Sequence, residues 1–365
     1  MYQTPLPTEY ADMSPEECDR RISAAKLALC SQLIVLGHHY QRDEIIKHAH
    51  FRGDSYKLAQ EAAARPEAEF VVFCGVHFMA ESADILTTDE QRVILPNLSA
   101  GCSMADMANL FQVRTCWREL ERTLGTAVSQ VVPVTYINSA ANLKAFVGEK
   151  GGTVCTSSNA AGAVKWALAQ GSKVLFFPDQ HLGRNTGVRL GFDADRDMCV
   201  WDPFKPLGGN TEEALRAATF ILWKGHCSVH QRFTAGQIAC ARADHPGVNV
   251  IVHPECPLDV VQAADLNGST EAIIKAIENA PSGTTWAVGT EINLVNRLAH
   301  EHPDKTIFCL DPQVCPCSTM YRIHPSFLCW TLDNLVAGNV VNEIVVPPKV
   351  KHFAHQALQR MLQIA

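Results

Sequence analysis

Three times along the chain, a short run of apolar and largely β-branched residues ends abruptly in polar side chains. Runs of this kind are typical of buried strands in parallel β-sheets, because both faces of a parallel sheet are covered. The three runs occupy residues 33–40, 131–138 and 248–255. A repeat at this scale indicates one supersecondary unit used three times, which constrains the fold more than any single motif does.

A hydroxyl-bearing residue follows each run and is predicted to open an Ala-rich helix. Ser55 lies 17 residues after His38, and Thr270 lies 17 residues after His253. Ser157 lies 21 residues after Tyr136. Taken singly, each of the three is also explained as an ordinary helix N-cap, because Ser and Thr are preferred there. Their recurrence behind a polar strand end favours a second interpretation, in which helix N-termini bind anions.

A second apolar run follows each predicted helix, at residues 70–75, 173–178 and 285–289. Strand, helix and strand form the βαβ unit of α/β folds with parallel sheets. The sequence therefore predicts three similar three-layer αβα domains with parallel sheets. Their expected bounds are residues 1–125, 126–240 and 241–334, with residues 335–365 as a candidate addition to the first domain.

Ligands of such sheets bind outside the carboxyl ends of the strands, where the three polar tips lie. Alternate residues of a strand point to the same face, so each tip presents a pair of side chains. The pairs are His38 with Tyr40, Tyr136 with Asn138, and His253 with Glu255.

Fourteen cysteines are present. In each of the three units, one cysteine follows the second strand and lies in a loop that contains Gly or Pro. Cys102 lies 47 residues after Ser55, and Cys317 lies 47 residues after Thr270, whereas Cys227 lies 70 residues after Ser157. Three converging thiolates suit a [4Fe–4S] cluster with one iron open to substrate. Spacing alone leaves incidental loop thiols as an alternative explanation.

Composition excludes several classes of partner. The net charge is -7 and there is no tract rich in Lys and Arg, so a nucleic-acid partner is not expected. The N-terminal segment lacks the basic and apolar regions of a secretory signal, and no apolar run reaches the roughly 18 residues of a membrane span. We therefore expect a cytoplasmic protein that does not associate with membranes.

These motifs resemble those of the quinolinate synthase family along nearly the whole chain. The matching segments are residues 37–40, 53–56, 76–83, 98–107, 134–139, 154–160, 177–187, 223–230, 252–257, 268–272 and 289–291. The resemblance implies three α/β domains arranged with pseudo-threefold symmetry around a central active site. It also implies an enzyme of NAD biosynthesis that condenses iminosuccinate with dihydroxyacetone phosphate to give quinolinate, phosphate and water.

The resemblance further implies a [4Fe–4S] cluster held by Cys102, Cys227 and Cys317, with Cys315 as the alternate third ligand. The residues that it assigns to substrate binding are His38, Ser55, Tyr136, Asn138, Ser157, His253, Glu255 and Thr270. Glu255 is the candidate general base or acid, with His253, Tyr40 and Tyr136 as its partners in proton transfer. His181 and His230 stay outside this set. L-Aspartate oxidase, the source of iminosuccinate, is a candidate protein partner.

Three alternatives share part of the pattern. An iron–sulfur hydro-lyase would use the same open iron on a single substrate. Three anion-binding sites argue against it, because they suit an enzyme that binds two anionic substrates. A binding protein for an anionic metabolite would need no cluster. A zinc enzyme fits less well, because all-cysteine zinc sites are usually closed and structural.

Overall fold

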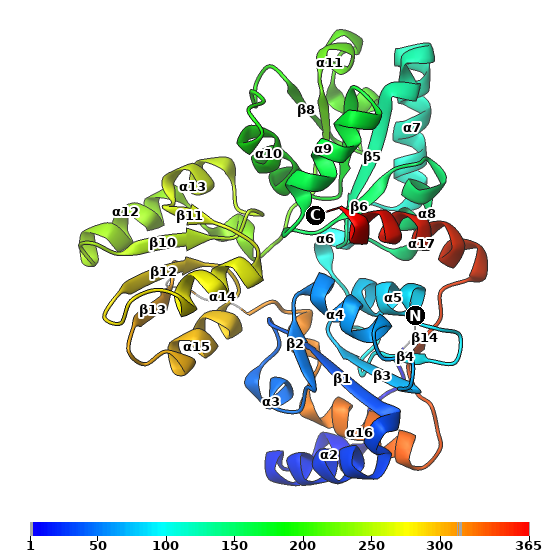
Figure 1. Ribbon diagram of the computed structural model, residues 1–365, viewed down its shortest axis with the longest axis vertical. Helices are drawn as coiled ribbons and strands as arrows, with labels where there is room; N and C mark the ends of the chain where they lie inside the picture. Colours follow the sequence, from blue (N-terminus) through cyan, green and yellow to red (C-terminus); the bar gives the residue numbers. More distant parts are fainter. Residues whose placement is uncertain (1–2, 312, 314–315, 365) are drawn as a thin grey trace. The chain divides into compact units, whose positions relative to one another are not determined.

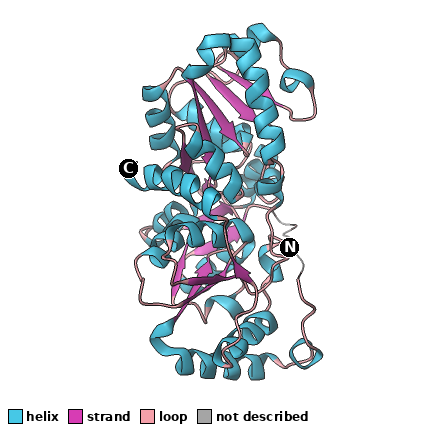
Figure 2. Cartoon of the chain, turned by 90° about the vertical axis from the view of Figure 1, so that its right-hand side faces the viewer, coloured by secondary structure: helices cyan, strands magenta, loops and turns pink. Residues whose placement is uncertain are grey.

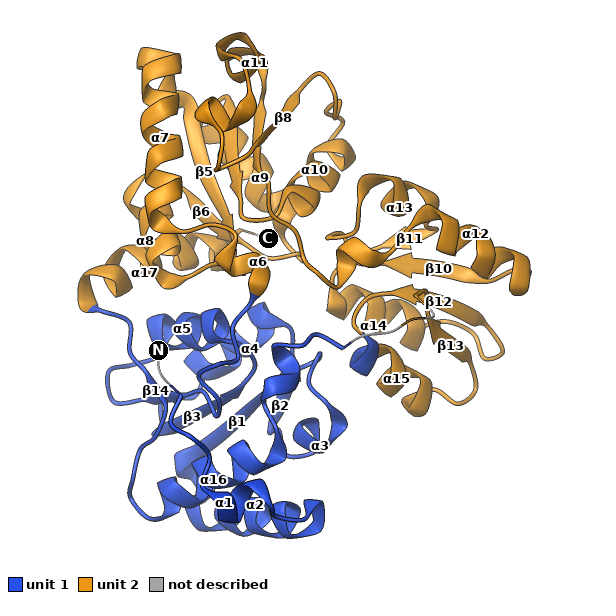
Figure 3. Ribbon diagram, turned by 180° about the vertical axis from the view of Figure 1, so that it is seen from behind, with its two compact units in different colours: residues 1–102, 292–294, 315–347 blue, residues 103–291, 295–314, 348–365 orange. Residues whose placement is uncertain are grey.

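The structure is a computed structural model that describes residues 3–311, 313 and 316–364. The chain divides into two compact units (Figure 3). The first unit comprises residues 1–102, 292–294 and 315–347, and the second comprises residues 103–291, 295–314 and 348–365. In each unit, helices enclose the strands of the sheets (Figure 2).

The first unit contains one five-stranded sheet, which we call the β1 sheet, in the order β14-β4-β3-β1-β2 (Figure 1). Its strands are β1 (Leu33–His38), β2 (Phe51–Gly53), β3 (Phe70–Cys74), β4 (Arg92–Ile94) and β14 (Glu343–Ile344). Its helices are α1 (Thr8–Ala11), α2 (Pro15–Leu29), α3 (Asp43–Ile46), α4 (Ser55–Ala63), α5 (His77–Leu86) and α16 (Pro325–Val336). All strand pairs are parallel except that of β14 with β4.

The second unit contains two parallel sheets. The β5 sheet has the order β6-β5-β7-β9-β8, and the β10 sheet has the order β11-β10-β12-β13. The strands of the β5 sheet are β5 (Val131–Tyr136), β6 (Thr153–Cys155), β7 (Lys173–Phe177), β8 (Met198–Trp201) and β9 (Phe220–Trp223). Those of the β10 sheet are β10 (Asn249–Val252), β11 (Leu266–Asn267), β12 (Thr285–Gly289) and β13 (Thr306–Cys309).

The helices of the second unit connect these strands. They are α6 (Ser103–Asp106), α7 (Leu110–Leu124), α8 (Ala141–Glu149), α9 (Ala160–Gln170), α10 (Gln180–Arg189), α11 (Glu212–Ala217), α12 (Ala235–Asp244), α13 (Leu258–Ala263), α14 (Thr270–Glu278), α15 (Ile292–Glu301) and α17 (Pro348–Gln363). Helix α15 belongs to this unit from Val295 onward.

The α/β class with parallel sheets is confirmed, and three sheets are present. Each predicted pair of strands forms a parallel ladder at the centre of a sheet, namely β1 with β3, β5 with β7, and β10 with β12. Each connection is longer than a simple βαβ unit, however. A short helix and a strand of two or three residues (β2, β6 or β11) precede each Ala-rich helix.

All three sheets therefore share one order, in which the second strand lies on one side of the first, and the third and fourth strands lie on the other side. The chain direction across the sheet reverses next to the first strand. Crevices that bind ligands form at the carboxyl end of the strands at such a reversal. The polar tips predicted from the sequence lie at this position of each sheet.

The C-terminal stretch contributes one element to each unit. Strand β14 pairs with β4 in the first unit, and Arg92 at the start of β4 forms an ion pair with Glu343. Helix α17 packs against α8 in the second unit, where Arg360 donates to the carbonyl oxygen of Gly152. Across the described residues, we find no helix with both the length and the apolar character to cross a membrane.

Candidate active site

In the second unit, the carboxyl ends of β5 and β10 bring two predicted side chains together. Tyr136 is the last residue of β5, and Glu255 lies in the turn that follows β10. The Tyr136 hydroxyl donates to Oε1 of Glu255 at 2.6 Å. Both side chains are buried, so this hydrogen bond to a carboxylate forms away from water, where it is strong.

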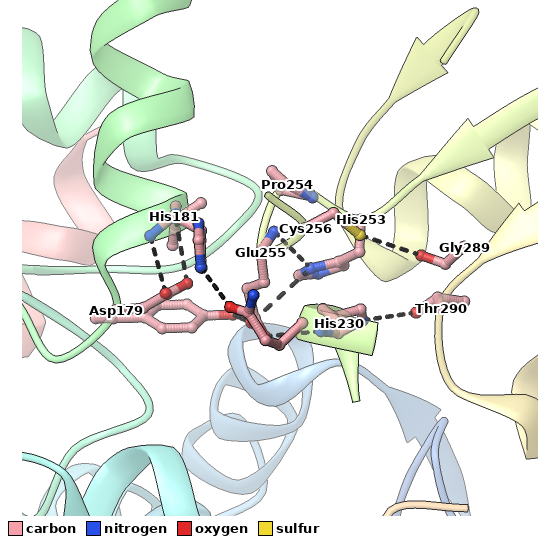
Figure 4. Close-up of polar contacts among 12 residues, drawn as sticks. Asp179, His181, His230, His253, Pro254, Glu255, Cys256, Gly289 and Thr290 are labelled. Atoms are coloured by element: carbon pink, nitrogen blue, oxygen red, sulfur yellow. Dashed lines mark hydrogen bonds and ion pairs between the residues drawn. The ribbon is translucent and has the colours of Figure 1, made fainter. Parts of the chain in front are cut away.

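A histidine that the sequence analysis left aside completes the arrangement. Nδ1 of His230 lies 2.8 Å from Oε2 of Glu255, and Nε2 of His230 lies 3.1 Å from the Thr290 hydroxyl (Figure 4). Thr290 directly follows β12, so it too lies at the carboxyl end of a strand. Tyr136, Glu255, His230 and Thr290 thus form one continuous buried chain of hydrogen bonds.

His253 is held beside this chain. Its ring stacks on that of His230, with ring centroids 4.4 Å apart and an interplanar angle of 15°. The backbone N–H of Glu255 donates to its Nδ1 at 3.3 Å. This hydrogen bond makes Nδ1 an acceptor, so a neutral His253 carries its proton on Nε2.

The buried setting controls the charges of the two residues. Burial raises the pKa of Glu255, but His253 and His230, together with the Tyr136 hydroxyl, outweigh burial and lower it to about 2. Burial and the neighbouring His230 lower the pKa of His253 to about 3. At neutral pH, the site therefore presents a carboxylate next to a neutral imidazole. A carboxylate and an imidazole in contact are suited to moving protons.

Helix α10 brings two more titratable groups to the same region. Asp179 caps the helix by accepting from the backbone N–H groups of His181 and Leu182. Burial and the negative charge of Glu255 raise the pKa of Asp179 well above its usual range. Nε2 of His181 lies 2.6 Å from Oε1 of Gln231, whereas its buried Nδ1 has no hydrogen-bond partner among the described residues.

A cavity of about 310 Å³ opens nearby in the second unit. Ser157 lines it, as do Pro254 from the turn that carries Glu255 and Ser269 from the start of α14. Arg189 and Lys275 add positive charge to its wall, partly balanced by Glu271. Asn138, two residues beyond β5, is half-buried, and Thr270 is buried at the first position of α14.

The structure corrects one expectation about the three hydroxyl residues. None of them is the N-cap of its helix, because the capping residues are Asp54, Asn159 and Ser269. The Asp54 carboxylate accepts from the N–H groups of Tyr56 and Lys57. Ser55 and Thr270 occupy the first helical turn, and Ser157 lies in the turn before α9. The explanation of these residues as ordinary caps is therefore wrong.

The first unit holds the remaining predicted side chains. His38 ends β1, and its ring packs edge-on against Tyr40 with centroids 4.8 Å apart. The N–H of Tyr40 donates to Nδ1 of His38 at 3.1 Å, as the N–H of Glu255 does to Nδ1 of His253. The first and third repeats thus fix the same histidine tautomer through the same local hydrogen bond.

The predicted cysteine ligands are more exposed to solvent than most other described cysteines. Cys102, Cys227 and Cys317 are partly exposed on loops, whereas Cys74 and Cys155 are buried. Burial raises the pKa of the Cys74 thiol to about 12, which disfavours the thiolate that metal binding requires. Cys315, the alternate ligand, lies outside the described residues.

One group in the second unit has the composition of a metal site. The potential ligand atoms of Cys227, His230 and Glu255 all lie within 4.8 Å of one another. A thiolate, an imidazole and a carboxylate are all ligands of transition metals. This arrangement can hold a metal, and it brings a predicted cysteine ligand to the predicted acid or base.

Two contributions escaped the sequence analysis for the same reason. His230 lies in the irregular segment between β9 and α12, and Asp179 lies in a helix cap. Neither follows the first strand of its unit, which is the position that identified Tyr136 and Glu255. A usable signal was the Gly225–His230 loop itself, because its two histidines flank the predicted ligand Cys227.

Comparisons with known proteins agree with this geometry. A model of the family described as quinolinate synthetase A protein matches residues 20–363. A quinolinate synthase of Corynebacterium glutamicum is 59% identical over 362 residues, covering 99% of this chain and 91% of the relative. A quinolinate synthase of Herpetosiphon aurantiacus is 57% identical, covering 98% of this chain and 95% of the relative. The chain is therefore an enzyme that belongs to the quinolinate synthetase A protein family.

Proposed function

We propose that this chain is a quinolinate synthase that joins iminosuccinate to dihydroxyacetone phosphate. One molecule of each gives one quinolinate, one inorganic phosphate and two waters, without net oxidation or reduction. The observation that carries the proposal is the buried chain Tyr136–Glu255–His230–Thr290, found in a protein more than half identical to relatives named quinolinate synthase. Condensation, dehydration and aromatisation all require protons to be moved at defined positions.

The chain's own residues supply that proton transfer. Glu255 is ionised at neutral pH and accepts from Tyr136, so it serves as the base, while the Tyr136 hydroxyl serves as its proton-carrying partner. His230 connects Glu255 to Thr290, which gives the proton a path away from the carboxylate. The neutral His253 offers a further donor through Nε2. Tyr40 has in the first repeat the position that Glu255 has in the third, and we assign it to proton transfer as well.

The anionic groups of both substrates need donors. We assign this binding to Ser55, Ser157 and Thr270, with His38 and Asn138 beside them. Ser55 and Thr270 are the first residues of α4 and α14, next to the helix N-termini, and Ser157 lines the open cavity. Hydrogen bonds from hydroxyl and backbone N–H groups to a carboxylate or phosphate are stronger than bonds between neutral groups.

A [4Fe–4S] cluster on Cys102, Cys227 and Cys317 fits the donor set, because these thiols are accessible and stand on loops. When bound, such a cluster supplies an open iron that acts as a Lewis acid toward a substrate oxygen. The position of Glu255 close to Cys227 supports the assignment, because acid–base groups must lie near the reacting atoms. We also propose a cytoplasmic location, where L-aspartate oxidase would supply the unstable iminosuccinate.

The proposal is tested by assaying quinolinate formation with anaerobically purified protein. Glu255→Gln keeps the size of the side chain but removes the base, so kcat is expected to fall on the order of 100-fold or more. Glu121→Gln, on the exposed edge of α7, is the matched control and should leave kcat unchanged. Absence of quinolinate from the wild type, with a full complement of iron, would refute the proposed function.

A further inference from the structure

The turn that carries Glu255 has little regular structure of its own. Strand β10 ends at Val252, and the next helix, α13, begins at Leu258. Between them, the N–H of Cys256 donates to the carbonyl oxygen of His253 at 3.0 Å, which closes a tight turn. Glu255 occupies the third position of this turn. Its side chain must nevertheless meet both Tyr136 and His230 at hydrogen-bonding distance.

A single side-chain amide from helix α10 holds the turn on both sides of Glu255. Nδ2 of Asn185, in α10, donates to the carbonyl oxygens of Pro254 and Cys256, at 2.8 Å in each case. Asn185 is 7% exposed, so water does not replace it readily. Both N–H bonds of the amide are used, one for each residue that flanks Glu255.

The orientation of this amide is fixed by the turn. Its Oδ1 is buried and has no hydrogen-bond partner among the described residues. A flipped amide would direct Oδ1 at two carbonyl oxygens, which would leave three acceptors without a donor. The pair of hydrogen bonds to the turn is therefore the interaction that specifies Asn at this position.

Helix α10, which carries Asn185, is itself held in place beside the turn. Asp179 fixes the start of the helix by capping it, and α10 packs against α13, which follows the turn. The turn is thus held by the helix beneath it, and Asn185 provides the hydrogen bonds that set its exact position.

We propose that Asn185 is a positioning residue for Glu255. It acts through the two carbonyls that flank Glu255 and has no contact with the Glu255 side chain in this role. Displacement of a catalytic group by about 1 Å can cost about 100-fold in rate. The proposal rests on the proposed function, because it assigns the role of Asn185 to the reaction of Glu255.

Asn185→Leu tests this directly, because leucine has a similar volume but no donor. Asn185 also lines the cavity that contains Ser157, so KM will change to some extent. We expect kcat to fall on the order of 10- to 100-fold, which is a larger effect than the change in KM. The matched control is Asn210→Leu. Nδ2 of Asn210 also donates to backbone carbonyls, those of Val200 and Leu207, at the edge strand β8. This control should lower thermal stability and leave kcat unchanged.

A double-mutant cycle separates positioning from a purely structural role. If Asn185 acts through Glu255, Asn185→Leu should have no further effect on kcat in a Glu255→Gln background. An equal loss of kcat in both backgrounds would overturn the proposal, and so would an unchanged kcat for Asn185→Leu in the otherwise wild-type enzyme.

Hydrogen exchange provides a readout that is independent of activity. In the holoenzyme, Asn185→Leu should increase amide exchange in peptides that cover residues 253–257, while peptides from β7 and β9 keep their wild-type rates. Unchanged amide exchange in the turn would overturn the proposal that Asn185 holds it in place. If the wild type made no quinolinate, the proposed function would fail by itself, and the exchange measurement would still decide whether Asn185 holds the turn.

Discussion

At the scale of single residues, the site depends on groups that are buried in defined charge states. Glu255 keeps its charge because Tyr136 and His230 both bind its carboxylate. His253 stays neutral because burial disfavours its cationic form. Burying an ionised group without partners would be costly, so these contacts are a condition of folding.

The lowered pKa of His253 predicts how the stability of the protein depends on pH. Its pKa is about 3 in the folded protein and about 6.5 in the unfolded chain, so the unfolded state binds more protons between these values. Stability is therefore fully present above about pH 6.5 and falls as the pH drops toward 3, by about 1 kcal/mol per pH unit near pH 5.5.

His253→Gln should remove this contribution. We expect the melting temperature of the variant to change less between pH 7.5 and pH 5.5 than that of the wild type, as measured by anaerobic thermal denaturation. His300→Gln, at an exposed position in the last turn of α15, is the control. An equal pH dependence in wild type and His253→Gln would show that folding does not lower the pKa of His253, which would contradict this prediction.

At the residue scale, the strand-tip pattern in the sequence singled out side chains that the structure brings together. Tyr136 and Glu255 were identified in this way, and the structure joins them by a hydrogen bond. His230 and Asn185 were missed, because a loop residue and a residue within a helix have no periodic pattern that reveals their partners. Their importance comes from tertiary contacts, which local sequence does not encode.

At the scale of elements, the central strands were predictable and the short ones were not. Strands β3, β7 and β12 are runs of four or five apolar residues, which are recognisable by composition. Strands β2, β6 and β11 have only two or three residues, too few for an alternating pattern. Their omission also misplaced the helix caps, since the strand before each helix determines where that helix begins.

Variants of the adjacent residues Asp54 and Ser55 can separate helix capping from the substrate binding that we propose for Ser55. Asp54→Ala removes the cap of α4, so the melting temperature should fall by about 2 °C or more, for a cost of about 1 kcal/mol. Ser55→Ala should leave the melting temperature within about 1 °C and raise KM about tenfold, through loss of a hydrogen bond to an anionic substrate. Thermal denaturation and steady-state kinetics measure the two effects, and a Ser55→Ala enzyme with unchanged KM would remove Ser55 from the binding site.

At the scale of the whole molecule, one topology is used three times. Each sheet has the same order of its first three strands, and each places its polar tip where that order reverses. The repeat was visible in the sequence because parallel strands buried on both faces are strongly apolar. The division of the chain into two compact units was not visible, since it depends on how later segments pack onto earlier ones.

The most direct test of the central claim is anaerobic analysis of iron and sulfide, with Mössbauer spectra, on wild type and single Cys→Ser variants. The account predicts about four irons per chain in the wild type, and loss of the cluster in Cys102→Ser, Cys227→Ser and Cys317→Ser. Cys240→Ser, at an exposed position of α12, should keep the wild-type iron content. A wild-type protein without a cluster under strict exclusion of oxygen, or three variants that keep it, would contradict the account.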